Sequence, residues 1–245
     1  MEKSTAKIIT QLHEIIPELN SNQIKLVLDV IQVLSEPYEN IEFNSSWIFT
    51  NDFIDVLCDF VRIHHALSDE PFTKDKFEYA LDRTAKILGI SSTLPGRTNP
   101  GHDIKIQEKR ISLKTQADNS IKLDYIHISK FMELGKGKWE TLEDLMHFRD
   151  LFLEHMNDYE MIITFRCLSK ANERESGLWK YEMIEIPKSL FQKATNAKFE
   201  MRNESKQYPK PGYCYVKDNN VDIFQLYFDG GGERKMQVKN ILKKE

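Results

Sequence analysis

Hydrophobic residues recur at three- and four-residue spacing through the first 70 positions of the chain. That spacing is typical of amphipathic helices, and it predicts three of them, over residues 4–17, 21–36 and 51–67. Pro17 and Pro37 end the first two, because proline cannot continue a helix. We therefore expect a helical subdomain over residues 1–68, which serves either as plain scaffold or as a surface that contacts a partner or DNA.

The pattern changes after residue 72. Thr73 is a good cap for a fourth helix, whose core face would carry Phe77 and Leu81 and whose left-handed end suits Gly89. Period-two alternation then predicts strands. The later elements expected are a strand at 121–128, a short helix at 130–134, a helix from 141 to about 157, and strands at 159–168, 178–186, 213–216, 222–228 and 233–239. This succession predicts an α/β fold with a central mixed sheet of about five strands flanked by helices.

Two further alternating runs, residues 103–106 and 110–115, are separated by a short polar turn and predict a β-hairpin. Pro100 and Gly101 let the backbone turn sharply into the first strand. In an antiparallel pair the start of one strand lies beside the end of the other. Asp103 and Lys114 are therefore expected side by side at one rim of the hairpin.

The composition is that of a globular protein, with 40% hydrophobic and 29% charged residues. The net charge of −4 means that a nucleic-acid surface would need basic residues segregated from acidic ones. The three cysteines, Cys58, Cys167 and Cys214, lack metal-site spacing and predict free thiols in a reducing compartment. Without a signal segment or a run of about 18 apolar residues, we expect a soluble cytoplasmic protein that contacts no membrane.

After residue 193 basic and aromatic residues interleave. In the predicted strand at 233–239, Arg234 alternates with a lysine–glutamine–lysine series that would line one edge. Such a basic strand suits a DNA groove, because arginine and glutamine pair with base edges and lysine with phosphates. A solvated polar face is the alternative. The residues expected to contact DNA are Arg97, Lys130, Arg234, Lys235, Gln237 and Lys239.

Asp103, Ser112 and Lys114 resemble the Asp…(Asp/Glu)-x-Lys signature of the restriction-endonuclease-like nucleases, the PD-(D/E)xK superfamily. The stretch from Pro100 to Asp103 stands where the family has Pro-Asp, with two residues inserted. Ser112 replaces the usual carboxylate, as Ser, Asn or Gln do in some type II restriction enzymes. The resemblance covers roughly residues 73 to 190, on the family's α-β-β-β-α plan. The first helix of that plan often contributes a further glutamate, which would be Glu78 in this chain.

The resemblance implies a type II restriction endonuclease, which hydrolyses double-stranded DNA at a short sequence with Mg²⁺ and leaves 5′-phosphate and 3′-hydroxyl ends. Asp103, Glu78 and the backbone carbonyl of Leu113 would hold the metal. Lys114 would orient or deprotonate the attacking water. Because Ser112 carries no charge, the second carboxylate needs a source. Glu78 is favoured over two others further along the chain, Asp118 and Glu133.

The resemblance also implies a modification methylase as genetic companion, and either a homodimer or a monomer that nicks each strand in turn. On this reading residues 1–68 are the helical subdomain, 69–192 the nuclease core and 193–245 a basic β-rich recognition element. A repair or structure-selective nuclease of the same fold would share the site. Two readings without catalysis also stay open: a DNA-binding protein in which Ser112 marks a decayed site, and a surface hairpin with an ordinary Asp–Lys ion pair.

Overall fold

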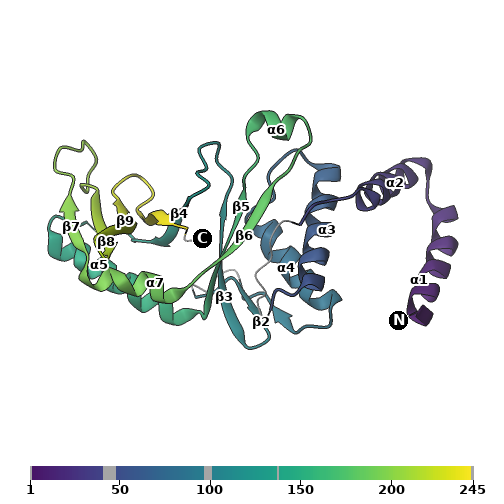
Figure 1. Cartoon of the computed structure of the whole chain (residues 1–245), viewed down its shortest axis with the longest axis horizontal. Helices are drawn as coiled ribbons and strands as arrows, with labels where there is room; N and C mark the ends of the chain where they lie inside the picture. Colours follow the sequence, from purple (N-terminus) through teal and green to yellow (C-terminus); the bar gives the residue numbers. More distant parts are fainter. Residues whose placement is uncertain (1, 41–47, 97–100, 137, 244–245) are drawn as a thin grey trace. The chain divides into compact units, whose positions relative to one another are not determined.

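The computed structural model describes residues 2–40, 48–96, 101–136 and 138–243, with side chains from residue 5 onward. The chain divides into two compact units, residues 1–70 and 71–245 (Figure 1). None of the described helices is both long enough and apolar enough to span a lipid bilayer.

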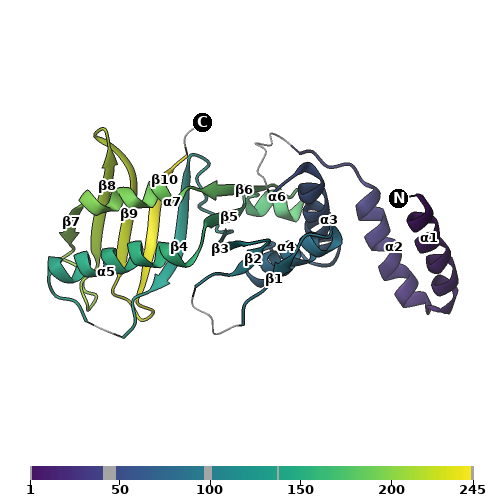
Figure 2. The same ribbon diagram turned by 90° about the horizontal axis from the view of Figure 1, so that it is seen from below.

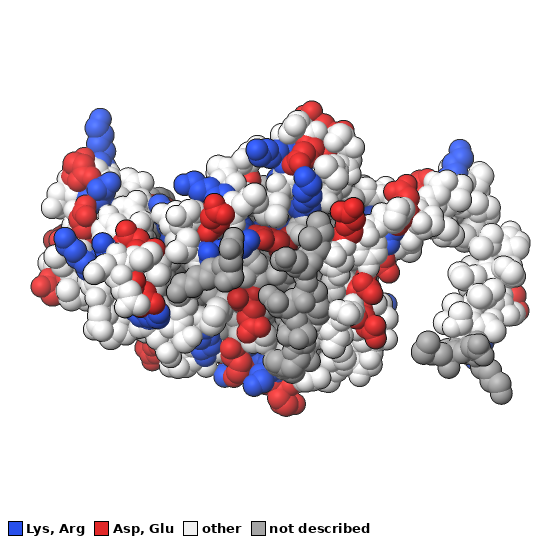
Figure 3. Space-filling view, in the orientation of Figure 1, with Lys and Arg blue, Asp and Glu red and all other residues white. Residues whose placement is uncertain are grey.

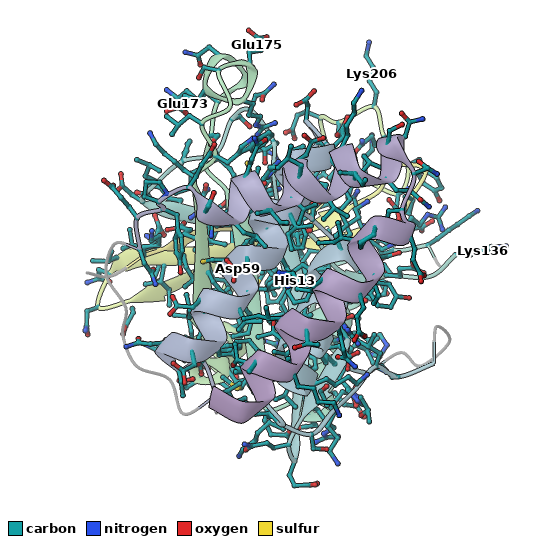
Figure 4. All side chains as sticks on the ribbon, turned by 90° about the vertical axis from the view of Figure 1, so that its right-hand side faces the viewer. His13, Asp59, Lys136, Glu173, Glu175 and Lys206 are labelled. Atoms are coloured by element: carbon teal, nitrogen blue, oxygen red, sulfur yellow. The ribbon has the colours of Figure 1, made fainter. Side chains whose placement is uncertain are left out.

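Helices form the first unit, as the apolar spacing predicts. They are α1 (Glu2–Ile15), the short helix η1 (Ile16–Glu18), α2 (Ser21–Ser35) and α3 (Asn51–Leu67). Asn20 caps α2 by accepting from the amide of Gln23 at 3.1 Å, and Thr50 caps α3. Arg62 of α3 donates to the carbonyls of Val33 and Glu36 and so ties the end of α2 to α3. Figure 4 shows these helices, with His13 marking α1 and Asp59 marking α3.

The first sheet of the second unit has the strand order β1-β2-β3-β5-β6. Its strands are β1 (Ser92–Thr93), β2 (Ile104–Ile106), β3 (Lys109–Gln116), β5 (Met161–Cys167) and β6 (Tyr181–Ile186). β3 and β5 run parallel and the other pairs antiparallel, so the predicted mixed five-stranded sheet is confirmed. The hairpin turn is tighter than expected: β3 starts at Lys109, and Gln107 takes a φ of 52°.

Helix α4 (Asp75–Ile87) packs on this sheet through Phe77, whose ring stacks on that of Phe165 in β5 at 4.5 Å between centroids. Gly89 follows the helix at a φ of +71°, which favours glycine, as predicted. The expected cap at Thr73 is wrong. The N-cap residue is Lys74, which makes no side-chain capping bond.

The second sheet is antiparallel, in the order β4-β10-β9-β8-β7. Its strands are β4 (Tyr125–Glu133), β7 (Lys198–Met201), β8 (Gly212–Asp218), β9 (Val221–Asp229) and β10 (Lys235–Leu242). The helices beside it are α5 (Leu142–His155) with η2 (Met156–Asp158), and α7 (Lys188–Gln192) with η3 (Lys193–Asn196), while α6 (Ala171–Glu175) joins β5 to β6. Figure 2 shows α5 and α7 across one face of this sheet. Phe152 of α5 and Phe191 of α7 belong to the buried core.

The predicted helix at 130–134 is wrong, because β4 continues through those residues to Glu133. β10 supplies a hydrogen-bonding partner from far along the chain, and this pairing overrides the local helix signal. The register shifts between the Met132–Met236 and Ile128–Val238 pairs, and such an irregularity re-aims a side chain. Phe131, within the shifted stretch, is buried in the core. The predicted start of β4 at residue 121 is also early, since the strand begins at Tyr125.

The second sheet takes strands from both sides of residue 193, because β4 precedes that residue and β7–β10 follow it. The division into a nuclease core and a recognition element at residue 193 stays a prediction. The predicted free thiols are present, with Cys58 half-buried and both Cys167 and Cys214 buried.

Candidate active site

The site begins where β2 stops pairing with β3. The last strand pair is Ile104 with Ile111, and the amide of Asp103 still donates to the carbonyl of Ile111 at 3.0 Å. Two residues further along β3, the Asp103 carboxylate takes the place of a strand partner and accepts a hydrogen bond from the amide of Leu113 at 2.5 Å. The backbone of β3 therefore fixes the Asp103 carboxylate at the strand edge.

Ser112 and Lys114 are two residues apart on β3, so their side chains share one face of the sheet. Ser112 is only 2% exposed. Its hydroxyl lies 3.3 Å from the Asp103 carboxylate and accepts a hydrogen bond from the Lys114 ammonium at 2.9 Å. Ser112 thus bridges Asp103 and Lys114.

The Lys114 ammonium is held where water is scarce. It lies 5.3 Å from the centre of the Phe131 ring of β4. Burial lowers the pKa of Lys114, because desolvation disfavours the charged form, while Asp103 and Glu78 act in the opposite direction. A lysine in such a position is easier to deprotonate than one in bulk water.

Glu78 reaches the same group from α4 and is half-buried. Burial raises the pKa of Glu78 to about 7, with further increases from Asp103 and Asp75 and a decrease from Lys114. These mutual electrostatic effects mean that the structure brings Glu78, Asp103, Ser112 and Lys114 together, as the hairpin and helix patterns predict. Their catalytic roles stay predictions.

The group fits a divalent cation. In an extended strand the N–H and C=O of one residue point to the same edge, so the carbonyl of Leu113 shares the edge of its amide, beside Asp103. Glu78 and Asp103 repel each other, and a bound cation would relieve that repulsion. Mg²⁺ needs only one or two carboxylates beside waters and phosphate. No group of three or more His, Cys, Asp or Glu side chains suited to a metal occurs in the described part of the chain.

The other two candidate carboxylates make different contacts. Asp118 accepts from the amide of Ser120 at 2.9 Å and from the side chain of Gln116 at 3.0 Å, which holds it in the turn after β3. Glu133, at the far end of β4, forms an ion pair with Lys130 at 2.7 Å. The geometry therefore favours Glu78 as the partner of Asp103.

Most of the residues predicted to contact DNA instead form contacts with other residues of the protein. Lys130 and Lys235 both form ion pairs with Glu233, at 2.6 and 3.3 Å. Arg234 donates to the carbonyl of Lys136. Arg97 lies outside the described residues. On the face in Figure 3, basic and acidic side chains are interspersed over the second unit rather than gathered into separate areas.

The predicted alternation of the last strand is confirmed, since Met236 and Val238 are buried while Lys235, Gln237 and Lys239 are half-buried, but the expected basic edge is wrong. β10 lies between β4 and β9 and is hydrogen-bonded on both sides, so it presents side chains from its faces alone. Arg234 precedes the strand. Gln237 donates to Asp229 at 3.2 Å, and the Lys239 ammonium lies 3.5 Å from the centre of the Tyr227 ring.

The sequence reading missed the tyrosines beside Lys239. Tyr213 in β8 and Tyr227 in β9 are directly paired and their ring centres lie 4.8 Å apart. Both belong to alternating runs that were predicted as strands. The alternation could have indicated their shared face once the strand order was known.

Comparison with known proteins gives a consistent result. The model of the SmaI family, described as type II site-specific deoxyribonuclease, matches residues 12–245. The type II restriction enzyme SmaI of Serratia marcescens is 47% identical over 196 residues, which cover 79% of this chain and 76% of that enzyme. No solved structure matches.

Proposed function

The chain belongs to the SmaI family of type II site-specific deoxyribonucleases, and we propose that it cleaves DNA by a Mg²⁺-dependent hydrolysis that leaves 5′-phosphate and 3′-hydroxyl ends. The single observation that carries this proposal is the chain of contacts from Asp103 through Ser112 to Lys114, with Glu78 within electrostatic range. Carboxylates beside a desolvated lysine suit metal-assisted hydrolysis of a phosphodiester.

Asp103, Glu78 and the carbonyl of Leu113 would hold the metal. When bound, Mg²⁺ neutralises the non-bridging phosphate oxygens and acidifies a coordinated water. The amide of Leu113 anchors the Asp103 carboxylate, and a rigid ligand costs no reorganisation during the reaction.

Lys114 would act on the attacking water. Its hydrogen bond to Ser112 fixes its position, and its lowered pKa leaves more of the side chain in the neutral form, which can accept a proton from the water. As water attacks phosphorus, the bond to the 3′-oxygen breaks. The 3′-oxygen gains a proton to become a hydroxyl, and the phosphate stays on the 5′ side. Ser112 would hold Lys114 in place of the carboxylate usual in the wider superfamily.

The partners follow from this activity. The substrate is double-stranded DNA, and a cell that makes such an enzyme needs a companion methyltransferase to protect its own DNA. Cutting both strands with one such site per chain requires either a homodimer or two successive nicks. Free thiols fit the reducing cytoplasm.

The test is digestion of unmethylated phage DNA with Mg²⁺ or with EDTA, alongside the Lys114→Ala variant. Discrete Mg²⁺-dependent fragments that the variant does not produce support the proposal, and sequencing their ends gives the recognition site. Ends that polynucleotide kinase labels only after phosphatase treatment carry a 5′-phosphate. A metal-dependent smear would indicate a nuclease without site specificity, and binding without cutting would indicate a decayed site.

A further inference from the structure

The two faces of the second sheet differ sharply. One face is covered by α5 and α7 and carries buried apolar residues such as Leu226 and Val238. The opposite face is polar and half-exposed. β8, β9 and β10 are neighbours in this sheet. Tyr213 of β8 pairs with Tyr227 of β9, and Tyr227 pairs with Gln237 of β10, so these three residues form one row across the polar face.

Lys239 lies on this face over the two tyrosines. Its ammonium is 3.5 Å from the centre of the Tyr227 ring and 5.5 Å from that of Tyr213. An aromatic face attracts a cation without neutralising its charge. We call Tyr213, Tyr227 and Lys239 the tyrosine platform.

Lys239 differs from the other basic residues predicted to contact DNA. Lys130 and Lys235 form ion pairs with glutamates, whereas no ion pair of Lys239 occurs among the residues that the structure describes. The nearby Asp229 carboxylate is occupied instead by the side chain of Gln237 at 3.2 Å and the amide of Gly231 at 3.0 Å. Lys239 therefore keeps its charge available for an anion from outside the chain.

The platform also lies between two hollows. One, of about 510 Å³, is lined by Lys239, by His127 and Ser129 of β4 and by Thr115 of β3. Gln116, two residues after Lys114 and on the same face of β3, also lines this hollow, which therefore begins on the Lys114 face of that strand. The other, of about 430 Å³, has both platform tyrosines in its wall, together with residues of the loop after β7; its lining residues are Arg202, Glu204, Ser205, Lys206, Gln207, Pro211, Tyr213 and Tyr227. The two hollows therefore flank the platform, one at Lys239 and the other at the two tyrosines.

We propose that the tyrosine platform binds the sugar–phosphate backbone of duplex DNA to one side of the scissile phosphate. This inference rests on the proposed function, since it needs the phosphodiester at Lys114. The Lys239 ammonium pairs with a phosphate, and the phenol hydroxyls of Tyr213 and Tyr227 donate to backbone oxygens. These residues hold the register of the duplex against Lys114 and carry no base preference.

Duplex binding in EDTA tests the platform without cleavage. Fluorescence anisotropy with short labelled duplexes, one containing the site found by digestion and one unrelated, compares wild type with Lys239→Ala. The variant is expected to bind both duplexes about tenfold more weakly, and the slope of log affinity against log salt falls by about 1. Lys193→Ala is the matched control, because Lys193 lies in η3 beside the helix-covered face and pairs with Asp218. Its affinity and salt slope are expected to equal those of wild type.

A second pair of variants tests the rings. Tyr227→Leu removes the surface under Lys239 and is expected to weaken binding to both duplexes, whereas Tyr227→Phe keeps the ring and is expected to weaken it less. Lys239→Arg is expected to restore the salt slope. Circular dichroism and thermal unfolding confirm that each variant is folded.

Three results would overturn the assignment: unchanged affinity for Lys239→Ala, an unchanged salt slope, or a loss confined to the duplex with the recognition site, which would mean a base contact. The outcome is separable from the proposed function. A wild-type protein that neither binds nor cuts DNA refutes the proposed function. A wild type that cuts normally, with Lys239→Ala unaltered in binding, refutes the platform alone.

Discussion

β3 and β10 each carry a desolvated lysine, but the two strands use their hydrogen-bonding edges differently. β3 pairs with β2 only as far as Ile111, and beyond that point the Asp103 carboxylate takes the Leu113 amide. β10 is paired along both edges, to β4 and to β9. An edge offers backbone carbonyls together with side chains, which suits a metal site. A face offers side chains alone, which suits the backbone of a long ligand.

The two lysines differ in the same way. Lys114 lies among a hydroxyl and two carboxylates, whose charges oppose the effect of its burial on its pKa. Burial also lowers the pKa of Lys239, whereas Asp229 opposes the change and the ammonium lies on aromatic rings. We therefore expect the lysine at the edge to act in the chemistry and the lysine on the face to act in binding.

Lys114→Ala should have the largest effect. We expect cleavage to slow by about 10²- to 10⁴-fold, the range for loss of a proton-transfer group, with duplex affinity in EDTA unchanged. Single-turnover cleavage and anisotropy measure the two quantities. Lys193→Ala again serves as control and should cut at the wild-type rate. Equal losses of cutting and binding would contradict a chemical role for Lys114.

Ser112→Ala should have the next largest effect, because the Lys114 ammonium loses the hydroxyl that holds it. We expect cleavage to slow by about tenfold, corresponding to one hydrogen bond to a charged group. The pH profile of cleavage should shift as well, since Ser112 contacts both Lys114 and Asp103. A tenfold loss without any change in the pH profile would indicate a structural role only.

We expect the ionisation of Glu78 to have a smaller effect, which appears in how the thermal stability of the protein in EDTA depends on pH. Its pKa is raised from 4.5 to about 7, so between those values the folded protein holds a proton that the unfolded chain releases. The stability contributed by this proton is complete below about pH 4.5 and is lost as pH rises through about 7. Wild type should therefore lose more thermal stability than Glu78→Gln between pH 5 and 8. Parallel curves would show that Glu78 ionises normally.

Lys235→Ala should have the smallest effect, although Lys235 shares β10 with Lys239. Its ion pair with Glu233 already compensates its charge, and the Glu233 side of the pair is open to solvent, which limits what the pair contributes. We expect duplex affinity to fall by less than about twofold. If Lys235→Ala weakened binding as much as Lys239→Ala, the face as a whole, rather than the platform, would bind DNA.

The sequence predicted best those features that depend on neighbouring residues. Alternation and a polar turn predicted the β2–β3 hairpin and with it the meeting of Asp103 and Lys114, and helical spacing gave α4, which brings Glu78 close. Local sequence patterns did not predict that β3 and β5 pair in parallel, because this pairing joins residues some fifty positions apart.

The errors arose where distant strands decide the outcome. A short helix was predicted at residues 130–134, but Met132 and Glu133 of this stretch pair with β10. The last strand looked like a basic edge because its two neighbours could not be identified from local pattern. Tyr213 and Tyr227 meet Lys239 only through the order β8-β9-β10, so no local signal pointed to the platform.

The pairing of β4 with β10 has a consequence for synthesis of the protein on the ribosome. Glu133 pairs with Lys235, about a hundred residues later, and translation at about 5 to 20 residues per second takes roughly 5 to 20 s to cover that distance. Until β10 emerges, β4 lacks this partner, and the Phe131 ring does not yet lie beside the Lys114 ammonium. A nascent chain would therefore complete the candidate active site only late in its synthesis, and nuclease activity that depends on this site would be delayed relative to the start of translation.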